Sequence, residues 1–160
     1  PDDSELTSKE ALRNPYFPRV AVVRDFLKFP ILQNTITDSH FAKRDRMGRS
    51  LAFLARIVQD GWSGSPREVA IDEGSAVLVE PDGKAIVVGS GKGAYFIRPM
   101  QAPDVCRKDV PLTFRGIWVY KAPAGSHFNL MSWTGDGGVS YTLSTDQGVV
   151  QSAAPDRSIY

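Results

Sequence analysis

Cysteine and histidine are scarce in this chain of 160 residues. The single cysteine, Cys106, excludes an intramolecular disulfide and a zinc site with two or more thiolate ligands. A chain of this length does not need such links, because it can bury most of the surface that its unfolded form exposes. We therefore expect a fold held together by its hydrophobic core, without a metal ion or a cofactor.

Long hydrophobic runs and a strong charge of one sign are also missing. No apolar run approaches the roughly 20 residues of a membrane-spanning helix, and no signal peptide is visible. The chain begins at Pro1 rather than at a methionine, so we expect a trimmed polypeptide. The net charge is only +1, whereas proteins dedicated to duplex DNA carry a clear basic excess. Nucleic acid is therefore not favoured as the main partner.

The common catalytic motifs are absent as well. The sequence contains no Gly-x-Ser-x-Gly elbow, no His-Glu-x-x-His pair and no EF-hand spacing. The glycines of residues 89–93 invite a phosphate-loop interpretation, but Ile86 occupies the position of the first glycine and Gly93 follows Lys92. This segment is more typical of a hairpin turn.

Three helices are predicted in the first third of the chain. Residues 7–10 form a capping box, so a helix should begin near Ser8 and end before Pro15. A second helix is predicted over residues 19–29, with a strand as the alternative because of its β-branched residues. The strongest helix is predicted over residues 39–59. Its apolar stripe consists of Met47, Leu51, Leu54 and Val58.

After residue 67 the hydrophobic period changes from helical to alternating, which indicates strands joined by tight turns. The predicted strands are residues 69–71, 75–80, 84–88, 94–98, 114–121, 126–133, 139–144 and 149–150. The sequence thus predicts one α+β domain over residues 1–160, with N-terminal helices packed on a curved antiparallel sheet of about six or seven strands. Residues 1–62 should be mainly helical, residues 67–151 should form the hairpin sheet, and residues 152–160 should be a frayed tail.

A basic face on the strongest helix is the first candidate site. On a helical projection, Arg46, Arg49 and Arg56 lie opposite the apolar stripe, with Phe53 among them. Exposed arginines around an aromatic ring favour an acidic protein partner or a nucleic-acid backbone. The alternative is an ordinary solvated helix face.

Aromatic residues on the predicted strands form the second candidate. Phe114, Trp118 and Tyr120 share one face of a strand, and Trp133 lies on the next strand. If this face points inward, the rings belong to the core; if it points outward, they form a stacking surface for a sugar, a base or a peptide.

The two histidines are the third candidate. His40 and His127 could act as acid and base in RNA cleavage, with Arg98 stabilising the charge of the transition state. The alternative is structural, because His40 lies at a predicted helix start and His127 opens a predicted strand beside a turn.

Residues 128–143 resemble a terminal hairpin in the extracytoplasmic domains of some bacterial anti-sigma factors. In that hairpin a tryptophan precedes a glycine-rich turn, and a tyrosine and a leucine follow at strand spacing. The matching residues are Trp133, Gly137, Gly138, Tyr141 and Leu143. The resemblance implies a bacterial origin and slightly favours a periplasmic or other extracytoplasmic location over the cytoplasm.

The leading hypothesis is therefore a non-enzymatic binding or accessory domain that contacts a protein partner through its basic-aromatic helix face. One alternative is a small RNA-cleaving hydrolase or toxin that uses histidine and arginine on the sheet. Another is a ligand-binding sheet that uses Trp118 and Trp133.

Overall fold

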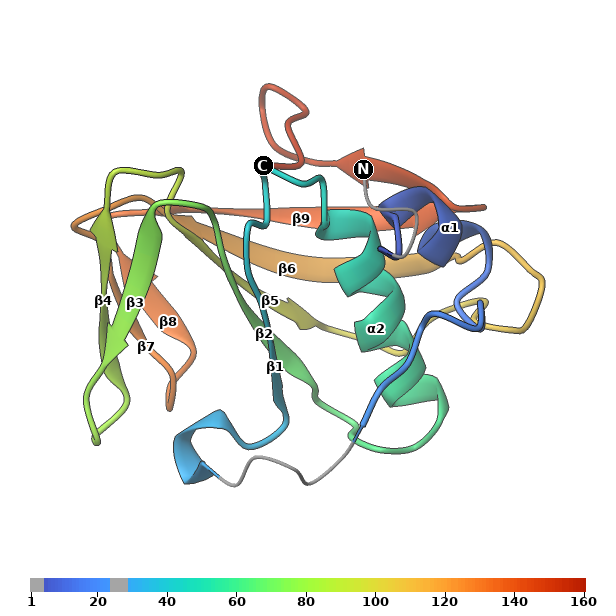
Figure 1. The fold of residues 1–160 in the computed structure, drawn as a ribbon, viewed down its shortest axis with the longest axis horizontal. Coiled ribbons are helices and arrows are strands. Elements are labelled where there is room, and N and C mark those ends of the chain that lie inside the picture. The colour runs from blue at the N-terminus through green and yellow to red at the C-terminus, as the bar shows by residue number, and fades with distance from the viewer. Residues whose placement is uncertain (1–4, 24–28) are drawn as a thin grey trace.

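The computed structural model describes residues 5–23 and 29–160, and Figure 1 shows their arrangement. The N-terminal part holds helix α1 (Ser8–Arg13), a short 3-10 helix η1 (Pro30–Leu32), strand β1 (Thr35–Asp38) and helix α2 (Met47–Gln59). The other strands are β2 (Arg67–Ile71), β3 (Ser75–Val79), β4 (Lys84–Gly89), β5 (Ala94–Pro99), β6 (Phe114–Ala122), β7 (His127–Asn129), β8 (Thr134–Asp136), β9 (Val139–Asp146) and β10 (Val149–Ser152). The predicted α+β class is confirmed.

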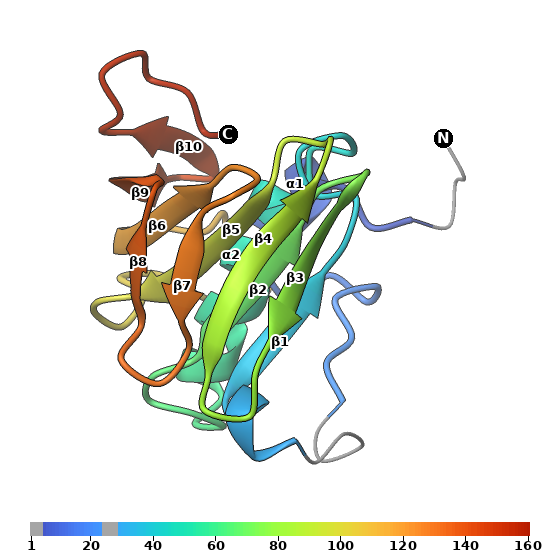
Figure 2. The same ribbon diagram turned by 90° about the vertical axis from the view of Figure 1, so that its left-hand side faces the viewer.

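The strands form two sheets, so the prediction of one sheet of six or seven strands is wrong (Figures 1 and 2). The larger sheet has the order β1-β2-β5-β6-β9-β10, and the smaller one has the order β3-β4-β7-β8. Hairpin β3–β4 is inserted between the paired strands β2 and β5, and hairpin β7–β8 between the paired strands β6 and β9. The two inserted hairpins join each other through β4 and β7, which creates the second sheet.

Strand β1 is a second departure from the expected fold, because it runs parallel to β2. The sequence predicted that a helix would begin at Ser39, but α2 begins at Met47. Two residues of the intervening turn, His40 and Asp45, adopt positive φ angles of 47° and 49°, which a right-handed helix cannot contain. The predicted helix thus loses its first two turns.

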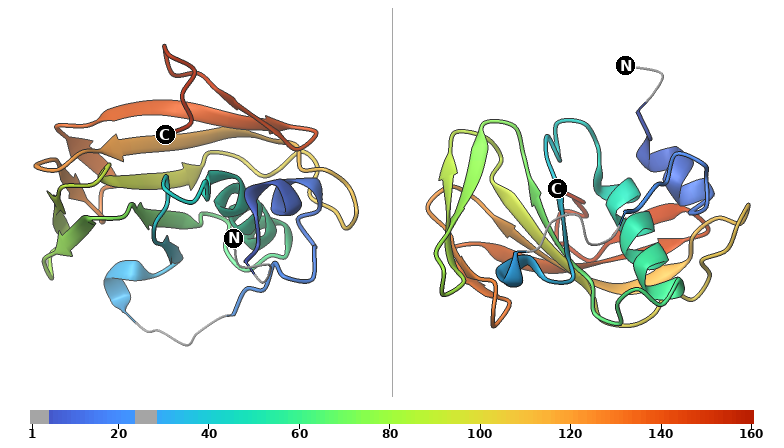
Figure 3. Two further views of the ribbon diagram at one scale, coloured as in Figure 1. Left: turned by 45° about the horizontal axis from the view of Figure 1, so that its top comes forward. Right: turned by 60° about the horizontal axis from the view of Figure 1, so that its bottom comes forward.

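Helix α1 agrees with its predicted start and end, and its capping box is present. The second predicted helix is not found in its described part, because residues 19–23 form neither a helix nor a strand; residues 24–28 lie outside the described residues. Helix α1 packs closely against α2 (Figure 3). A Cβ atom at Gly48 would lie 2.6 Å from Leu12 Cδ1, so this close approach requires glycine.

Two hydrophobic cores lie on opposite faces of the six-stranded sheet, because neighbouring residues of a strand point to opposite sides. On the helix face, Leu51 and Leu54 of α2 pack with Tyr95 and Ile97 of β5. On the other face, Phe96 of β5 packs against residues of the four-stranded sheet. Figure 1 shows the four-stranded sheet at one end of the long strands and the helices toward the other end. On the face of Phe96, part of the six-stranded sheet is therefore covered neither by the four-stranded sheet nor by the helices (Figure 1).

The C-terminal segment is ordered by contacts, in contrast to the frayed tail that the sequence predicted for residues 152–160. The Tyr160 hydroxyl donates a hydrogen bond to Asp45 Oδ1 at 2.8 Å and accepts one from the Met47 amide at 2.9 Å. Its ring lies edge-on to Phe41 and Tyr95. No local sequence signal indicates these contacts, because the partners are more than 60 residues away from Tyr160.

Candidate functional site

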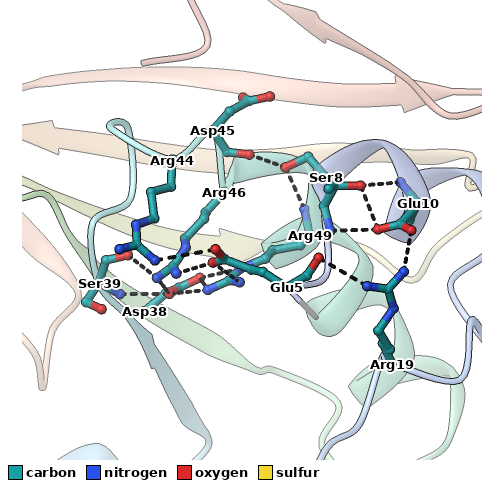
Figure 4. A network of polar contacts seen from close by, with 11 residues as sticks. Glu5, Ser8, Glu10, Arg19, Asp38, Ser39, Arg44, Asp45, Arg46 and Arg49 are labelled. Carbon is teal, nitrogen blue, oxygen red and sulfur yellow. Dashed lines mark hydrogen bonds and ion pairs between the residues drawn. The ribbon is translucent and has the colours of Figure 1, made fainter. Parts of the chain in front are cut away.

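The arginines of the predicted basic face are mostly buried in ion pairs (Figure 4). The Arg46 and Arg49 side chains are 11% and 14% exposed. Arg49 forms a bidentate contact with Asp38, from Nε to Oδ2 at 2.9 Å and from Nη2 to Oδ1 at 2.6 Å. Arg46 Nη1 contacts the same carboxylate at 3.0 Å, and both arginines also pair with Glu5. The sequence predicted exposed arginines on this helix face, whereas the Arg46 and Arg49 side chains are mostly buried.

Arg56 and Phe53 are also engaged within the molecule. Arg56 pairs with Asp60 at 2.8 Å, and its guanidinium carbon lies 3.9 Å from the centre of the Tyr16 ring. Phe53 is half-buried against the helix-face core. Protein binding through this face stays a prediction, but the described contacts leave little of its positive charge without a carboxylate partner.

On the opposite face of the six-stranded sheet, a second group of residues forms a row across the strands. Arg98 of β5 pairs in register with Trp118 of β6, and Trp118 pairs with Thr142 of β9. On the other side of Arg98, Glu68 of β2 pairs with Ile97 of β5, so Arg67, which precedes Glu68, lies on the strand next to Arg98 and on the same face of the sheet. We call these four residues, Arg67, Arg98, Trp118 and Thr142, the sheet-face row.

The two arginines of the sheet-face row have no carboxylate partner within 4.0 Å among the described residues. Arg67 donates a hydrogen bond to the carbonyl of Leu130 at 3.0 Å. The Nε atom of Arg98 is buried and has no hydrogen-bond partner. Like charges close together on neighbouring strands repel. This face therefore carries two positive charges that have no carboxylate partner, and their guanidinium carbons lie over aromatic rings, Arg67 at 4.9 Å from the centre of Trp133 and Arg98 at 5.3 Å from that of Trp118.

The two tryptophans proposed for ligand binding have different environments. Trp133 is only 2% exposed and packs edge-on against Phe96 and Phe128, so it belongs to the core. Trp118 is half-buried, stacks on Tyr120 with 6.0 Å between ring centres, and lies 5.3 Å from the Arg98 guanidinium carbon. Only Trp118 thus remains available as a partly exposed surface.

A shallow hollow of about 330 Å³ adjoins the sheet-face row at Thr142. It forms where the pairing of β6 and β9 is interrupted between Phe114 and Ile117, at Gly116, whose φ angle is +66°. Such a bulge opens the surface of a sheet locally. Besides Thr142, its polar lining includes Ser144 of β9 and Gln151 of β10. Hydroxyl and amide groups therefore lie on β9 and β10, across Trp118 of β6 from Arg98.

The proposed acid–base residues are not brought together. His40 lies in the turn after β1, with Nδ1 4.0 Å from Glu73. His127 is exposed on the outer face of β7, whereas Phe128 faces the inner core, so the four-stranded sheet separates His127 from Arg98. No hydrogen bond or ion pair links the three residues in the part of the chain that the structure describes. RNA cleavage by these groups stays a prediction without geometric support.

The remaining chemistry-bearing groups are limited. Burial raises the pKa of the Cys106 thiol to about 12, so this thiol is protonated at neutral pH. Within residues 5–23 and 29–160, no three His, Cys, Asp or Glu side chains are grouped so as to hold a metal ion. No described helix combines the length and the apolar character needed to cross a bilayer.

Sequence reasoning did not identify Arg67 as a candidate, because the strand that forms β2 was predicted to begin at Val69 rather than at Arg67. The signal was available, since Arg67 and Val69 share one phase of the alternation and Glu68 falls on the opposite phase. No protein-family model and no curated protein matches this sequence. The site is therefore interpreted from its geometry.

Proposed function

We propose that this protein is a non-enzymatic ligand-binding domain whose sheet-face row binds a polar, anionic ligand of the sugar-acid type. The observation that carries the proposal is the presence of two arginines, Arg67 and Arg98, on neighbouring strands of one face without a carboxylate partner among the described residues. An arginine fork matches the two oxygens of a carboxylate, and a bound anion would relieve the repulsion between the two guanidinium groups.

The neighbouring side chains favour a sugar acid over a nucleic acid. Thr142, Ser144 and Gln151 offer hydroxyl and amide groups that can both donate and accept hydrogen bonds, as a hydroxyl-rich ligand requires. The half-buried Trp118 adds an apolar ring edge. Tight binding of a nucleic-acid strand depends on many phosphate contacts, whereas this face provides only two cations without a carboxylate partner.

Extracytoplasmic action is part of the same proposal. It is supported by the resemblance of residues 128–143 to the extracytoplasmic domains of anti-sigma factors, and acidic glycans occur outside the cytoplasm. Binding rather than catalysis is proposed because His40, His127 and Arg98 lie apart.

Tryptophan fluorescence can test the proposal, because the indole of Trp118 lies in the row. We expect a saturable change with a short oligogalacturonate and none with an uncharged maltooligosaccharide of equal length. Arg98→Met, which keeps the contact with Trp118 but removes the charge, should weaken binding by about tenfold or more. The matched control is Arg107→Met, in an exposed loop, which should bind as the wild type does.

Three results would contradict the proposal: no saturable change, equal effects of Arg98→Met and Arg107→Met, or tighter binding of a single-stranded oligothymidylate than of the oligogalacturonate. The last result would instead favour a nucleic-acid partner.

A further inference from the structure

A cavity of about 320 Å³ lies on the helix face of the six-stranded sheet, opposite the sheet-face row. It is an open pocket, bordered by the N-terminal segment, helix α2 and strands β1 and β2. Its apolar walls include Leu6, Val22, Ile36 and Phe53, and the Arg49–Asp38 ion pair borders it. The volume suits a ligand of one ring with a short substituent.

Glu68 of β2 is among the residues that line this cavity. Its side chain is completely buried, and Oε1 accepts a hydrogen bond from the Ser50 hydroxyl at 2.6 Å. The other oxygen, Oε2, has no hydrogen-bond partner. An unpaired buried polar atom destabilises a fold, so its presence beside a cavity points to a partner that is supplied from outside.

The charges around Glu68 determine the kind of partner. Asp38 of β1 and Arg49 of α2 are the charged groups that act on Glu68, and they form an ion pair with each other. Arg46, Glu5 and the exposed Arg44 extend this network, and Arg19 at the cavity wall pairs with Glu10, so each of these cations has a carboxylate partner other than Glu68. Burial accordingly raises the pKa of Glu68 to about 8, and at neutral pH this carboxyl is mainly protonated.

We propose that the cavity binds a small, uncharged, mainly apolar molecule through a carbonyl-type oxygen that accepts a hydrogen bond from the Glu68 carboxyl group. A protonated carboxyl has one O–H donor, and with Oε1 already engaged by Ser50, the free donor position is Oε2. Val22, Ile36 and Phe53 contact the apolar body of the ligand. This site is separate from the sheet-face row and does not depend on its function.

Three small probes of similar size separate the alternatives. Acetophenone carries a carbonyl acceptor, toluene carries no polar group, and benzylamine carries a positive charge. Binding is followed at neutral pH on the ¹⁵N-labelled protein by the amide shifts of Ser50 and Glu68. We expect acetophenone to bind about fivefold more tightly than toluene, as one added hydrogen bond implies, and benzylamine to bind more weakly than either.

Two variants test the role of Glu68 itself. Glu68→Gln keeps an N–H donor at this position and should keep the preference for acetophenone over toluene. Glu68→Leu has no donor and should bind the two probes with about equal affinity. The matched control is Glu73→Gln, an exposed carboxylate outside the cavity, which should behave as the wild type does.

The proposal is overturned if acetophenone fails to shift these amides, if benzylamine binds most tightly, or if Glu68→Leu keeps the acetophenone preference. Arg98→Met should not affect any of the three probes, so the failure of this proposal and the failure of the sugar-acid proposal can be told apart.

Discussion

The arginines on the two faces of the six-stranded sheet differ in whether they have carboxylate partners. On the helix face, Arg46 and Arg49 are buried against Asp38 and Glu5, and both guanidinium groups have a carboxylate partner. On the other face, Arg67 and Arg98 lie on neighbouring strands, and neither has a carboxylate partner among the described residues. The arginines that the sequence predicted to be exposed are thus paired within the molecule, whereas Arg67 and Arg98 have no carboxylate partner within residues 5–23 and 29–160.

The difference shows that the role of an arginine depends on which segments fold over it. Glu5 precedes Arg46 by 41 positions, and the N-terminal segment and β1 bring both carboxylates to α2. In the part of the chain that the structure describes, no carboxylate pairs with the arginines of the sheet-face row. Buried pairs specify the geometry of a fold, while uncompensated charges reduce its stability and are typical of binding sites.

Glu68→Gln should produce the largest effect on stability, and it tests a completely buried residue of the helix face. Burial raises the pKa of Glu68 from 4.5 to about 8 in the folded state. Between these values the folded state holds a proton that the unfolded chain has lost. The free energy of unfolding contributed by Glu68 is therefore fully present below pH 4.5 and falls, by up to about 4 kcal/mol, as the pH rises to 8.

This prediction is checked by urea unfolding of both proteins across that pH range. The variant cannot titrate at this position, so the difference in stability between Glu68→Gln and the wild type should grow in favour of the variant with rising pH. A constant difference would show that Glu68 is already ionised in the folded state.

Arg49→Ala is the next largest change. It removes the bidentate partner of Asp38, whose side chain is 10% exposed. The free energy of unfolding should fall by about 3 kcal/mol, because this buried charge loses its partner. The control is Arg44→Ala: this side chain is 51% exposed, and its pair with Glu5 should be worth at most about 0.5 kcal/mol. Equal losses for the two variants in urea unfolding would contradict the distinction between buried and exposed pairs.

Local signals predicted much of the fold. The capping box of α1 depends on residues three positions apart, and the β3–β4 hairpin depends on a turn of adjacent residues, so both could be read from short segments. The division into two sheets could not, because it arises from the pairing of β2 with β5 and of β4 with β7 across long intervals. The position of Asp38 shows the same limit, because its carboxylate binds Arg49 rather than capping a helix.

The candidate site was predictable only in part. Trp118 and Arg98 were both identified, but for different functions, because their cross-strand pairing depends on the register of β5 and β6. Glu68 was not identified, although a charged residue beside the apolar run 69–71 is itself a signal. Its burial depends on the N-terminal segment, whose path over the sheet has no local signature.

Tyr160→Phe has a smaller expected effect and tests how the helix face is closed. The variant keeps the ring contacts with Phe41 and Tyr95 but removes the hydroxyl that bonds Asp45 and the Met47 amide. We expect a loss of about 1 kcal/mol in thermal or urea unfolding. Arg157→Ala, at an exposed position of the same segment, serves as the control. Unchanged stability of Tyr160→Phe would mean that the tail is frayed after all.

Arg98→Met should have the smallest effect on stability and tests the other face. Removing one of two like charges on neighbouring strands should leave the free energy of unfolding unchanged or raise it by about 0.3 kcal/mol. Added salt screens such repulsion, so the wild type and the charge-conserving variant Arg98→Lys should gain stability on going from low salt to about 0.5 M NaCl, relative to Arg98→Met. If Arg98→Met instead unfolds far more easily than Arg98→Lys at both salt concentrations, the Arg98 charge stabilises the fold, and the two faces do not differ in the way argued here.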